Sequence, residues 1–550
     1  MTTIKSTATP SFVIFSGGSA CNHIAKAFHE VGHQDVAYIL GISDNGGSTS
    51  EVLRVLGGPS IGDLRSRLTR LIDIVDASPS DERVAIKDLL SYRLSNDPEQ
   101  VKDEWASIVE GRHRLWKKIP AEKKETIRGF LTNFNGEILK RAHKRFNFCN
   151  GSIGNFFLTG ARLFFGSLEA ALFLFSAITG ISEFTSVLPV INTNHTATIA
   201  AQLQNGDTIL GQCEISHPST PPTSSHQHGA NSPSCLSSRM MVNPIDAFMQ
   251  LGDEPIPTSS DDYMTMIDKT KSTTLEDDDD NDDHAYTSNL FFSKHAEQQL
   301  SSPIRRLYYI NEYGQEIYPV PNPKVITQLS TKNTLIYSIG SLYTSIVPSL
   351  ILRNVGNAIS QSQSLDYKIL LLNGSNDRET HGYSALDFIL TITGALNESQ
   401  KVDCRRAFYQ TNLSQRMTTT AGASSYCGRT THGPSLSPYQ HNKSSLSSTS
   451  SHSSHNGGAD SGYASFSSSP THHYPPFPDQ LFQPSPPSSF ITHLVYLDHG
   501  EISVDVPSIE QLGIKCVKMK GNLCPSTGKP VYDDSVLTST LRSLHTQLVV

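Results

Sequence analysis

The feature that most constrains this chain is an apolar stretch that runs into a pair of glycines. Phe12 to Ser16 have the pattern of a β-strand, and Gly17-Gly18-Ser19 follows, just before a helical pattern over about residues 20–31. In doubly wound α/β folds, a strand, a glycine turn and a helix in this order present backbone N–H groups to a phosphate. The loop is neither G-x-G-x-x-G nor Walker A, because Ala20-Cys21-Asn22 replaces further glycines and no Gly-Lys-Ser/Thr follows.

Strand-like and helix-like segments keep alternating after this loop, which favours a parallel sheet. We predict a Rossmann-like α/β fold: a doubly wound, mainly parallel sheet with a charged helical excursion over 81–145 that covers the site. The apolar stretch Leu163 to Ile181 is too often interrupted to span a membrane and is expected to be a core helix. Further strands are expected at 36–42, 187–191, 197–203, 208–212 (after a hairpin turn at 204–207), 305–310, 334–338, 367–373 and 492–498, and a last helix at 533–547.

Two low-complexity tracts divide this pattern. We expect core segments at 11–216, 301–400 and 490–550, separated by disordered insertions at 217–300 and 411–489. The first insertion holds the acidic block Glu276 to Asp283, which repels itself, and both hold scattered histidines. Neither feature is expected to form a metal site, because metal ligands need a packed frame.

Composition excludes several classes of function. The formal net charge is -8 and basic residues gather only between Arg112 and Arg145, so we expect no nucleic-acid partner. No apolar signal or membrane-length segment is evident, and none of the eight cysteines forms a C-x-x-C pair. The expectation is a cytoplasmic protein with reduced thiols, no membrane contact and homodimer formation as one possible assembly.

A second loop, Asp44-Asn45-Gly46-Gly47-Ser48-Thr49, follows the expected strand at 36–42. Paired glycines let the backbone approach an anion, and the two hydroxyls are donors. Asp44 is the candidate catalytic and metal-binding residue, because a carboxylate here could hold Mg²⁺ against phosphates or accept a proton from an attacking hydroxyl. The alternative is an ordinary acidic cap of the next turn.

Three more loops share this character. In the third, Asp63 could cap a helix, and Arg65 in its first turn could meet a phosphate. In the fourth, Asn155 could contact a base, a ribose or a substrate edge. The fifth places Gly340, Ser341 and Thr344 between a strand and a helix, repeating the first cradle. Two such cradles in one sheet suit a diphosphate. Asp377 and Arg378 are weaker candidates, with helix capping by Asp377 as the alternative.

Taken together, these motifs resemble the CofD/YvcK (UPF0052) family. The resemblance rests on Gly-Gly-Ser, Asp-Asn-Gly-Gly-Ser-Thr, Gly-Asp-Leu-Arg, Gly-Asn-Phe-Phe-Leu, Val-Leu-Pro-Val and Gly-Ser-Leu-Tyr-Thr-Ser-Ile, in this order, and leaves both low-complexity tracts outside. It implies ligand binding at the carboxyl ends of the strands. Under it, Gly17, Gly18, Ser19, Gly340, Ser341 and Thr344 bind phosphate, Asn155 helps to hold a nucleotide, and Asp44 with Asn45 occupies the family's acidic loop.

The resemblance leaves two functions open. One branch is 2-phospho-L-lactate transferase, in which a hydroxyl of the deazaflavin Fo attacks the β-phosphate of lactyl-2-diphospho-5′-guanosine with Mg²⁺ and releases GMP. The other comprises regulators of carbon metabolism that bind UDP-sugars, and a regulator binding NADP is kept with it. Asn45 stands where the family commonly has a second Asp, which weakens the case for a metal. A dehydrogenase is disfavoured by the missing G-x-G-x-x-G motif.

Overall fold

A seven-stranded parallel sheet organises the described part of the chain, in a computed structural model. The structure describes residues 9–33, 35–74, 78, 81–141, 143–216, 299–311, 313–422 and 477–546, with side chains in the long helix described up to residue 411. The first predicted insertion, 217–300, lies outside the described residues except for 299 and 300. The second, 411–489, is described only at its two ends, 411–422 and 477–489. The acidic block and the histidines of both insertions lie outside the described residues.

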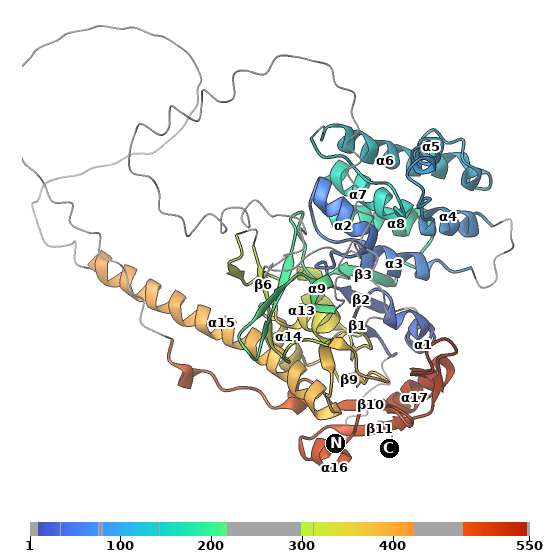
Figure 1. Cartoon of the computed structure of the whole chain (residues 1–550). Helices are drawn as coiled ribbons and strands as arrows, with labels where there is room; N and C mark the ends of the chain where they lie inside the picture. The colour runs from blue at the N-terminus through green and yellow to red at the C-terminus, as the bar shows by residue number, and fades with distance from the viewer. Residues whose placement is uncertain are drawn as a thin grey trace, which may run out of the picture. The chain divides into compact units, whose positions relative to one another are not determined.

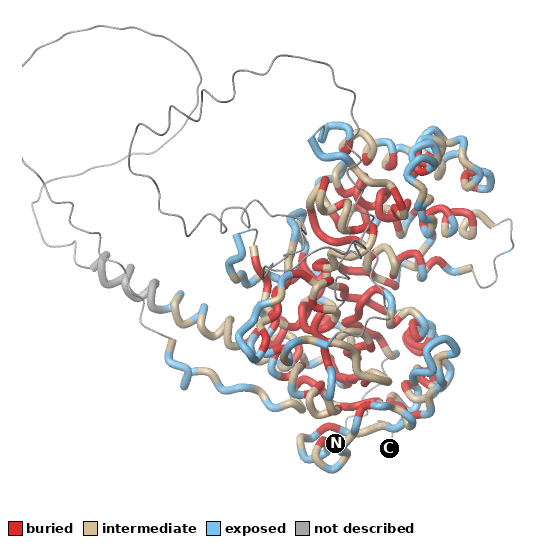
Figure 2. The backbone as a smooth tube through the Cα atoms, viewed as in Figure 1, coloured by how far each residue is buried: buried red, intermediate tan, exposed pale blue. Residues whose placement is uncertain are grey.

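All seven strands run in the same direction, in the order β3-β2-β1-β8-β9-β10-β11. This confirms the predicted doubly wound parallel sheet, and six of its strands coincide with predicted ones. The strands are β1 (Phe12–Ser16), β2 (Val36–Leu40), β3 (Thr185–Pro189), β8 (Thr334–Tyr337), β9 (Tyr367–Leu371), β10 (His493–Leu497) and β11 (Lys515–Met519). They are nearly continuous apolar runs because helices cover both faces of a parallel sheet, and the four residues Phe12 to Phe15 are completely buried (Figure 2).

A second, antiparallel sheet has the order β5-β4-β6-β7. Its strands are β4 (Thr198–Leu203), β5 (Thr208–Leu210), β6 (Ile304–Ile310) and β7 (Glu316–Ile317), and the predicted hairpin turn joins β4 to β5. The expectation that β6 resumes the main sheet was wrong, because β6 pairs with β4. A further hairpin is formed by β12 (Gly521–Leu523) and β13 (Pro530–Tyr532).

Helices occupy the connections between these strands (Figure 1). Up to β4 they are η1 (Ala20–His23), α1 (Ala25–Val31), α2 (Gly47–Leu56), α3 (Gly62–Leu71), α4 (Glu82–Ser91), α5 (Gln100–Val109), η2 (Arg114–Trp116), α6 (Ala121–Leu139), α7 (Ile153–Phe165) and α8 (Leu168–Thr179). After β5 they are α9 (Gln212–Ser216), α12 (Pro323–Thr331), η4 (Leu342–Ile346), α13 (Val347–Leu350), α14 (Val355–Ser360), η5 (Arg378–Thr380), α15 (Ala385–Gly422), η6 (Asp479–Leu481), η7 (Pro487–Ser489), α16 (Val506–Gln511) and α17 (Asp534–Thr546).

The chain separates into two compact units. The larger comprises Met1–Val402 with Pro484–Val550 and contains both sheets and the helices packed on them. The smaller, Asp403–Gln483, includes the last part of α15 and η6. The domain boundaries expected from composition stay a prediction.

The helical excursion forms a cluster of α4 to α8 at the β3 end of the sheet (Figure 1). An aromatic core holds it together: the Phe134 and Phe156 rings stack at 4.5 Å, and Trp105 meets Phe156 edge-on at 5.3 Å. The predicted core helix is interrupted at Gly166, where α7 ends in the left-handed conformation and Ser167 caps α8. No helix among the described residues is long and apolar enough to cross a membrane.

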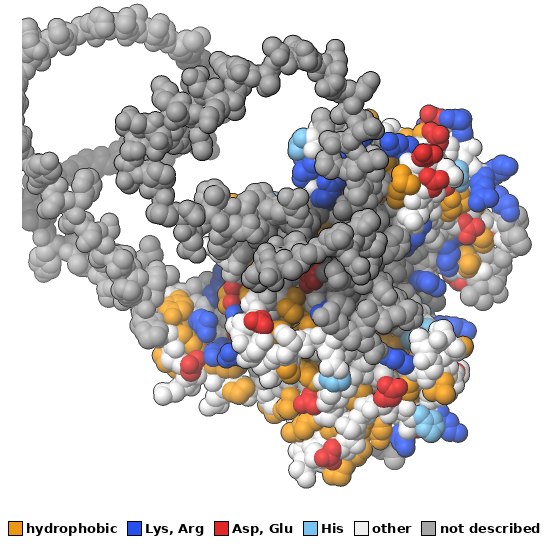
Figure 3. Space-filling view, viewed as in Figure 1, with side chains coloured by type: hydrophobic (Ala, Val, Ile, Leu, Met, Phe, Trp, Pro, Cys, Tyr) orange, Lys and Arg blue, Asp and Glu red, His pale blue; other side chains and the backbone are white. Residues whose placement is uncertain are grey.

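Charged side chains on the cluster do not form a basic field. On the face drawn in Figure 3, Lys and Arg lie among Asp and Glu, and several pair within one helix turn, as Arg128 does with Glu125. The charges of this surface are therefore mixed in sign, and the absence of a nucleic-acid partner stays a prediction.

A close contact between α6 and α7 gives a test of this packing. A Cβ added at Gly160 in α7 would overlap the carbonyl oxygen of Phe130 in α6, whereas one added at Gly129 in α6 would meet nothing within 4 Å. We expect Gly160→Ala to lower the free energy of unfolding by about 1 to 3 kcal/mol. The matched Gly129→Ala should raise it by about 0.5 to 1 kcal/mol, because alanine favours a helix interior. Urea unfolding measures both, and equal stability of the two variants would contradict the close packing.

Candidate functional site

The candidate site lies at the carboxyl ends of β1 and β8, which are neighbours in the sheet. From β1 the chain continues to β2 on one side, and from β8 it continues to β9 on the other. At such a switch point the chain leaves the two strands in opposite directions, and the crevice outside their carboxyl ends is the usual ligand position in open α/β sheets. The first and fifth predicted loops, Gly17–Ser19 and Gly340–Thr344, face each other here.

In the loop after β1, the two glycines are tightly packed and the serine that follows them is exposed to solvent. Gly17 and Gly18 are buried, whereas Ser19 is exposed. A Cβ on Gly17 would lie 2.7 Å from the Oγ atom of Ser345, and one on Gly18 would overlap the carboxylate of Asp63. Glycine is required at both positions because η4 and α3 approach the backbone closely.

The loop after β8 is fixed by a residue that the sequence analysis did not single out. The side chain of Asn373 accepts the N–H of Gly340 at 3.1 Å and donates to its carbonyl oxygen at 2.8 Å. Gly340 has a φ of 142°, which a residue with a side chain rarely adopts. Asn373 follows β9, the next strand of the sheet, and its two hydrogen bonds fix the backbone of Gly340.

The N-terminus of η4 is already bound to an acidic side chain. Glu379, from η5, accepts the N–H groups of Tyr343 at 2.9 Å and Thr344 at 3.1 Å, and the hydroxyl of Thr344 at 2.5 Å. Thr344 is 3% exposed. Of the fifth loop, Gly340 and Ser341 are thus the residues left for a ligand, and phosphate binding by Thr344 stays a prediction.

The loop after β2 places Asp44 at the rim of this crevice. Asp44 accepts the N–H of Gly46 at 3.0 Å, as the capping alternative anticipated. Its neighbour Asn45 is used differently: its Oδ1 atom accepts the N–H of Cys213 at 3.0 Å and holds the start of α9. Gly46 and Gly47 lead into α2, in which Ser48 is buried.

Asp63 lies between the first and second loops and is the most perturbed acid of the site. It accepts the N–H of Gly18, and its pKa is raised to about 7, mainly by burial and next by the charge of Asp44. The carboxylate is therefore held by the phosphate cradle and does not cap its own helix, since no side chain caps α3. An acid whose pKa lies near 7 can act as a proton acceptor at neutral pH.

Asn155 links three of the predicted loops in the interior. It is 1% exposed, and its amide donates to the hydroxyl of Ser48 at 3.0 Å while its carbonyl oxygen accepts from Nε of Arg65 at 3.2 Å. Burial and the nearby Arg93 lower the pKa of Arg65 to about 10. In this structure Asn155 orders the loops, and its expected contact with a nucleotide stays a prediction.

Arg67, which the sequence analysis passed over, is completely buried behind Asp63. Its guanidinium lies 4.4 Å from the centre of the Tyr38 ring, and none of its three nitrogens hydrogen-bonds within the described residues. Its charge favours the ionised form of Asp63. The position of Arg67 in α3 does not indicate its role in the sequence. Its contact with Tyr38 arises only because the fold packs α3 against β2.

Asp377 and Arg378 serve the protein's own structure. Asp377 caps η5 by accepting N–H groups of Glu379 and Thr380, each at 3.1 Å, which confirms the capping alternative. Arg378 donates to the carbonyl oxygen of Glu214 in α9 at 3.0 Å.

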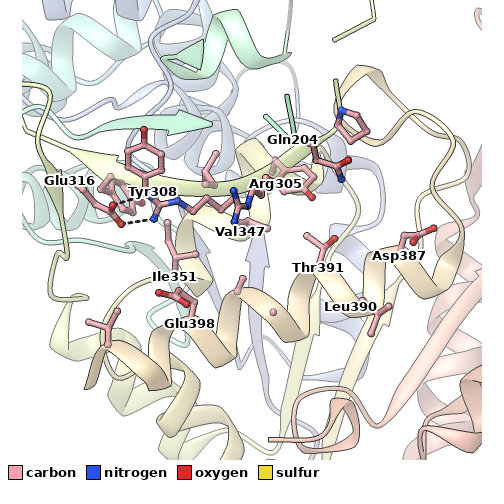
Figure 4. Close-up of a pocket in the computed structure, with 18 of the residues that line it drawn as sticks. Gln204, Arg305, Tyr308, Glu316, Val347, Ile351, Asp387, Leu390, Thr391 and Glu398 are labelled. Atoms are coloured by element: carbon pink, nitrogen blue, oxygen red, sulfur yellow. Dashed lines mark hydrogen bonds and ion pairs between the residues drawn. The ribbon is translucent and has the colours of Figure 1, made fainter. Parts of the chain in front are cut away.

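A separate cavity of about 740 Å³ lies between β6 and α15 (Figure 4). Arg305 on β6 lies across the cavity from Thr391 and Glu398 on α15, while Arg306 pairs with Glu316. Its lining includes Tyr343, whose backbone contacts Glu379, but none of the site residues predicted from the sequence. The site predicted from the loops and this cavity are therefore different places in the fold.

Comparison with known proteins gives a consistent result. The family model described as 2-phospho-L-lactate transferase CofD matches residues 12–424. The uncharacterized protein YNL011C of Saccharomyces cerevisiae is 40% identical over 399 residues, which are 70% of this chain and 83% of the yeast protein. A Nostoc sp. protein provisionally named a gluconeogenesis factor is 35% identical over 86 residues, which are 16% of this chain and 18% of that protein.

Two solved structures of the Bacillus halodurans protein BH3568 align with most of this chain. One covers 97% of this chain and 100% of its own, with a TM-score of 0.49 and 12% identity. The other, described as a member of the UPF0052 family, covers 96% and 99%, with a TM-score of 0.48 and 12% identity.

The raised pKa of Asp63 predicts how stability depends on pH. A folded-state pKa near 7 lies above the ordinary value of 3.8, so the folded protein binds more protons than the unfolded chain between about pH 4 and 7. Stability falls as pH rises through this window. We expect Asp63→Asn to become steadily more stable relative to the original protein as pH rises from 4.5 to 8.

Thermal unfolding at several pH values measures this effect. Asp81→Asn is the control with the opposite sign, because hydrogen bonds from Arg83 lower the pKa of Asp81 and stabilise its ionised form. An Asp63→Asn variant whose stability relative to the original protein does not rise over this range would show that the pKa of the carboxylate is not raised by its surroundings.

Proposed function

Because this chain belongs to the CofD family, we propose that it binds a nucleoside diphosphate at the carboxyl ends of β1 and β8. In the proposed reaction it transfers a phosphorus-containing group from this ligand to a hydroxyl. The matching family model is described as a 2-phospho-L-lactate transferase. We propose a guanosine diphosphate donor that carries a phospho-lactyl group. The facing loops Gly17–Ser19 and Gly340–Ser341 would hold its two phosphates through backbone N–H groups other than those of Gly18 and Gly340, which are bound to Asp63 and Asn373.

The observation that carries the proposal is the contact of Asp63 with Gly18. The Asp63 carboxylate accepts the Gly18 N–H, with its pKa near 7, so a proton acceptor lies against the loop proposed to hold phosphate. In the proposed step, the acceptor hydroxyl gives its proton to Asp63 and its oxygen bonds to the β-phosphorus. The bond from that phosphorus to the bridging oxygen breaks, and the nucleoside monophosphate leaves with the electron pair.

The residues present fit Mg²⁺. A Cβ at Gly62 would lie 2.7 Å from the hydroxyl of Thr49 and 3.7 Å from the Oδ2 atom of Asp44, so these two oxygens converge. Magnesium is commonly held by one or two carboxylates together with substrate phosphates. Among the described residues no three His, Cys, Asp or Glu side chains gather, so the ligand would have to supply further oxygens to the ion. Asp44 would hold the ion, which would neutralise phosphate charge.

A second function is favoured by Asn45. This residue stands where the family commonly has a second acid. Its side-chain oxygen accepts the N–H of Cys213. A site with one carboxylate fewer binds a divalent cation more weakly. The alternative is thus a regulator that binds a UDP-sugar or NADP without turnover. The Nostoc relative is provisionally named a gluconeogenesis factor.

Calorimetric titration separates the two functions. We expect GDP to bind with Mg²⁺ and at least about tenfold more weakly without it, a difference of 1.4 kcal/mol. Asp44→Asn should abolish the Mg²⁺ dependence. The control Asp207→Asn, in the exposed β4–β5 turn, should behave like the original protein. Metal-independent binding of UDP-N-acetylglucosamine or NADP would favour the regulator, and binding of none of these ligands would contradict both functions.

A further inference from the structure

Glu379 accepts hydrogen bonds from two parts of the chain that lie far from it in the sequence. The residue is 3% exposed and lies in η5. Its Oε2 atom accepts the N–H groups of Tyr343 and Thr344, while Oε1 accepts the hydroxyls of Thr344 at 2.5 Å and Ser216 at 2.8 Å. One side chain thereby joins η5, η4 and the end of α9.

The carboxylate takes the place that an anionic ligand would take at η4. The first N–H groups of a helix lack acceptors within the helix, and a negative group satisfies them. Here that group belongs to the protein, and the residues that it binds are also buried, with Tyr343 5% and Thr344 3% exposed. A ligand phosphate would reach these N–H groups only by displacing Glu379 from the interior.

We propose that Glu379 is a positioning residue that fixes η4, and through η4 both halves of the phosphate cradle, before the ligand binds. This inference rests on the proposed function for its ligand, but its structural part is independent of which ligand binds. The residue does not touch the ligand in this account.

Two contacts carry the position of η4 to the cradle. Ser345, next to Thr344, has its hydroxyl oxygen 2.7 Å from the point where a Cβ on Gly17 would lie, so η4 abuts the loop after β1. On the other side, η4 directly follows Gly340 and Ser341, and Asn373 clamps Gly340 from β9. A shift of η4 would therefore disturb the loops after both β1 and β8.

The same carboxylate also anchors α9. Ser216 ends α9, and Asn45 holds its beginning through the N–H of Cys213. The helix α9 thus spans from the loop that carries Asp44 to the carboxylate that fixes η4. Loss of Glu379 is expected to loosen α9 as well as η4.

Electrostatics and positioning predict opposite effects of removing this charge. Burial raises the pKa of Glu379 to about 7. Its ionised form near an anion site repels the ligand, so neutralisation alone would strengthen binding or leave it unchanged. Neutralisation to glutamine also leaves a single accepting oxygen where two served four hydrogen bonds. A loss of affinity in Glu379→Gln can therefore come only from the lost geometry.

The test combines amide hydrogen exchange of the protein without ligand and calorimetric titration with GDP and Mg²⁺. In Glu379→Gln we expect exchange in residues 340–346 to rise at least about tenfold and GDP affinity to fall about tenfold. Unchanged exchange in β1 and β8 would show that the fold persists. Thr344→Val, which keeps both N–H bonds to Glu379, should cause smaller changes of the same sign. The control Glu398→Gln removes an exposed charge from α15 and should change neither quantity.

Unchanged exchange at residues 340–346, or tighter GDP binding by Glu379→Gln, would overturn the inference. Should the original protein bind no nucleotide, the proposed function fails, and the exchange measurement alone still decides whether Glu379 holds η4. If exchange rises throughout the fold in Glu379→Gln, the milder variant Thr344→Val decides. A rise confined to residues 340–346 in Thr344→Val supports the inference, and no rise there overturns it.

Discussion

The parallel pairing of β1 with β8 joins the two halves of the chain and creates the crevice on which the site depends. Phe12 pairs with Thr334 and Phe15 with Tyr337, so the strands end at the same level. Both strands are buried and apolar, which ties their register to the packing of the whole core. Because the two strands are neighbours and end at the same level, the glycines that follow them lie close together at the switch point of the sheet.

Around this pairing, polar residues from other strands and helices hold the loops of the site. Asn373 after β9 shapes the backbone at Gly340, Asp63 on α3 binds Gly18, and Glu379 on η5 secures η4. Each of these contacts ends on backbone groups rather than on another flexible side chain. The cradle is therefore held by the protein before any ligand arrives, which lowers the entropy lost on binding.

The sequence predicted the sheet well, because strand period and glycine loops are local signals. The strands from β1 to β10 of the main sheet appear within a few residues of their expected positions, and the Gly-Gly loops follow them. It could not predict that β6 leaves the main sheet, since β6 has the same apolar composition as a core strand and only pairing with β4 distinguishes it. The roles of Arg67 and Glu379 were missed for a related reason: the partners of both come from distant parts of the chain.

A crystal structure of the protein with GDP and Mg²⁺ tests the central claim most directly. The account predicts the diphosphate between Gly17–Gly18 and Gly340–Ser341, with the metal ion bound to Asp44 and the Glu379 carboxylate still bound to η4. A nucleotide bound in the cavity between β6 and α15, or one whose phosphate replaces Glu379 at η4, would contradict it.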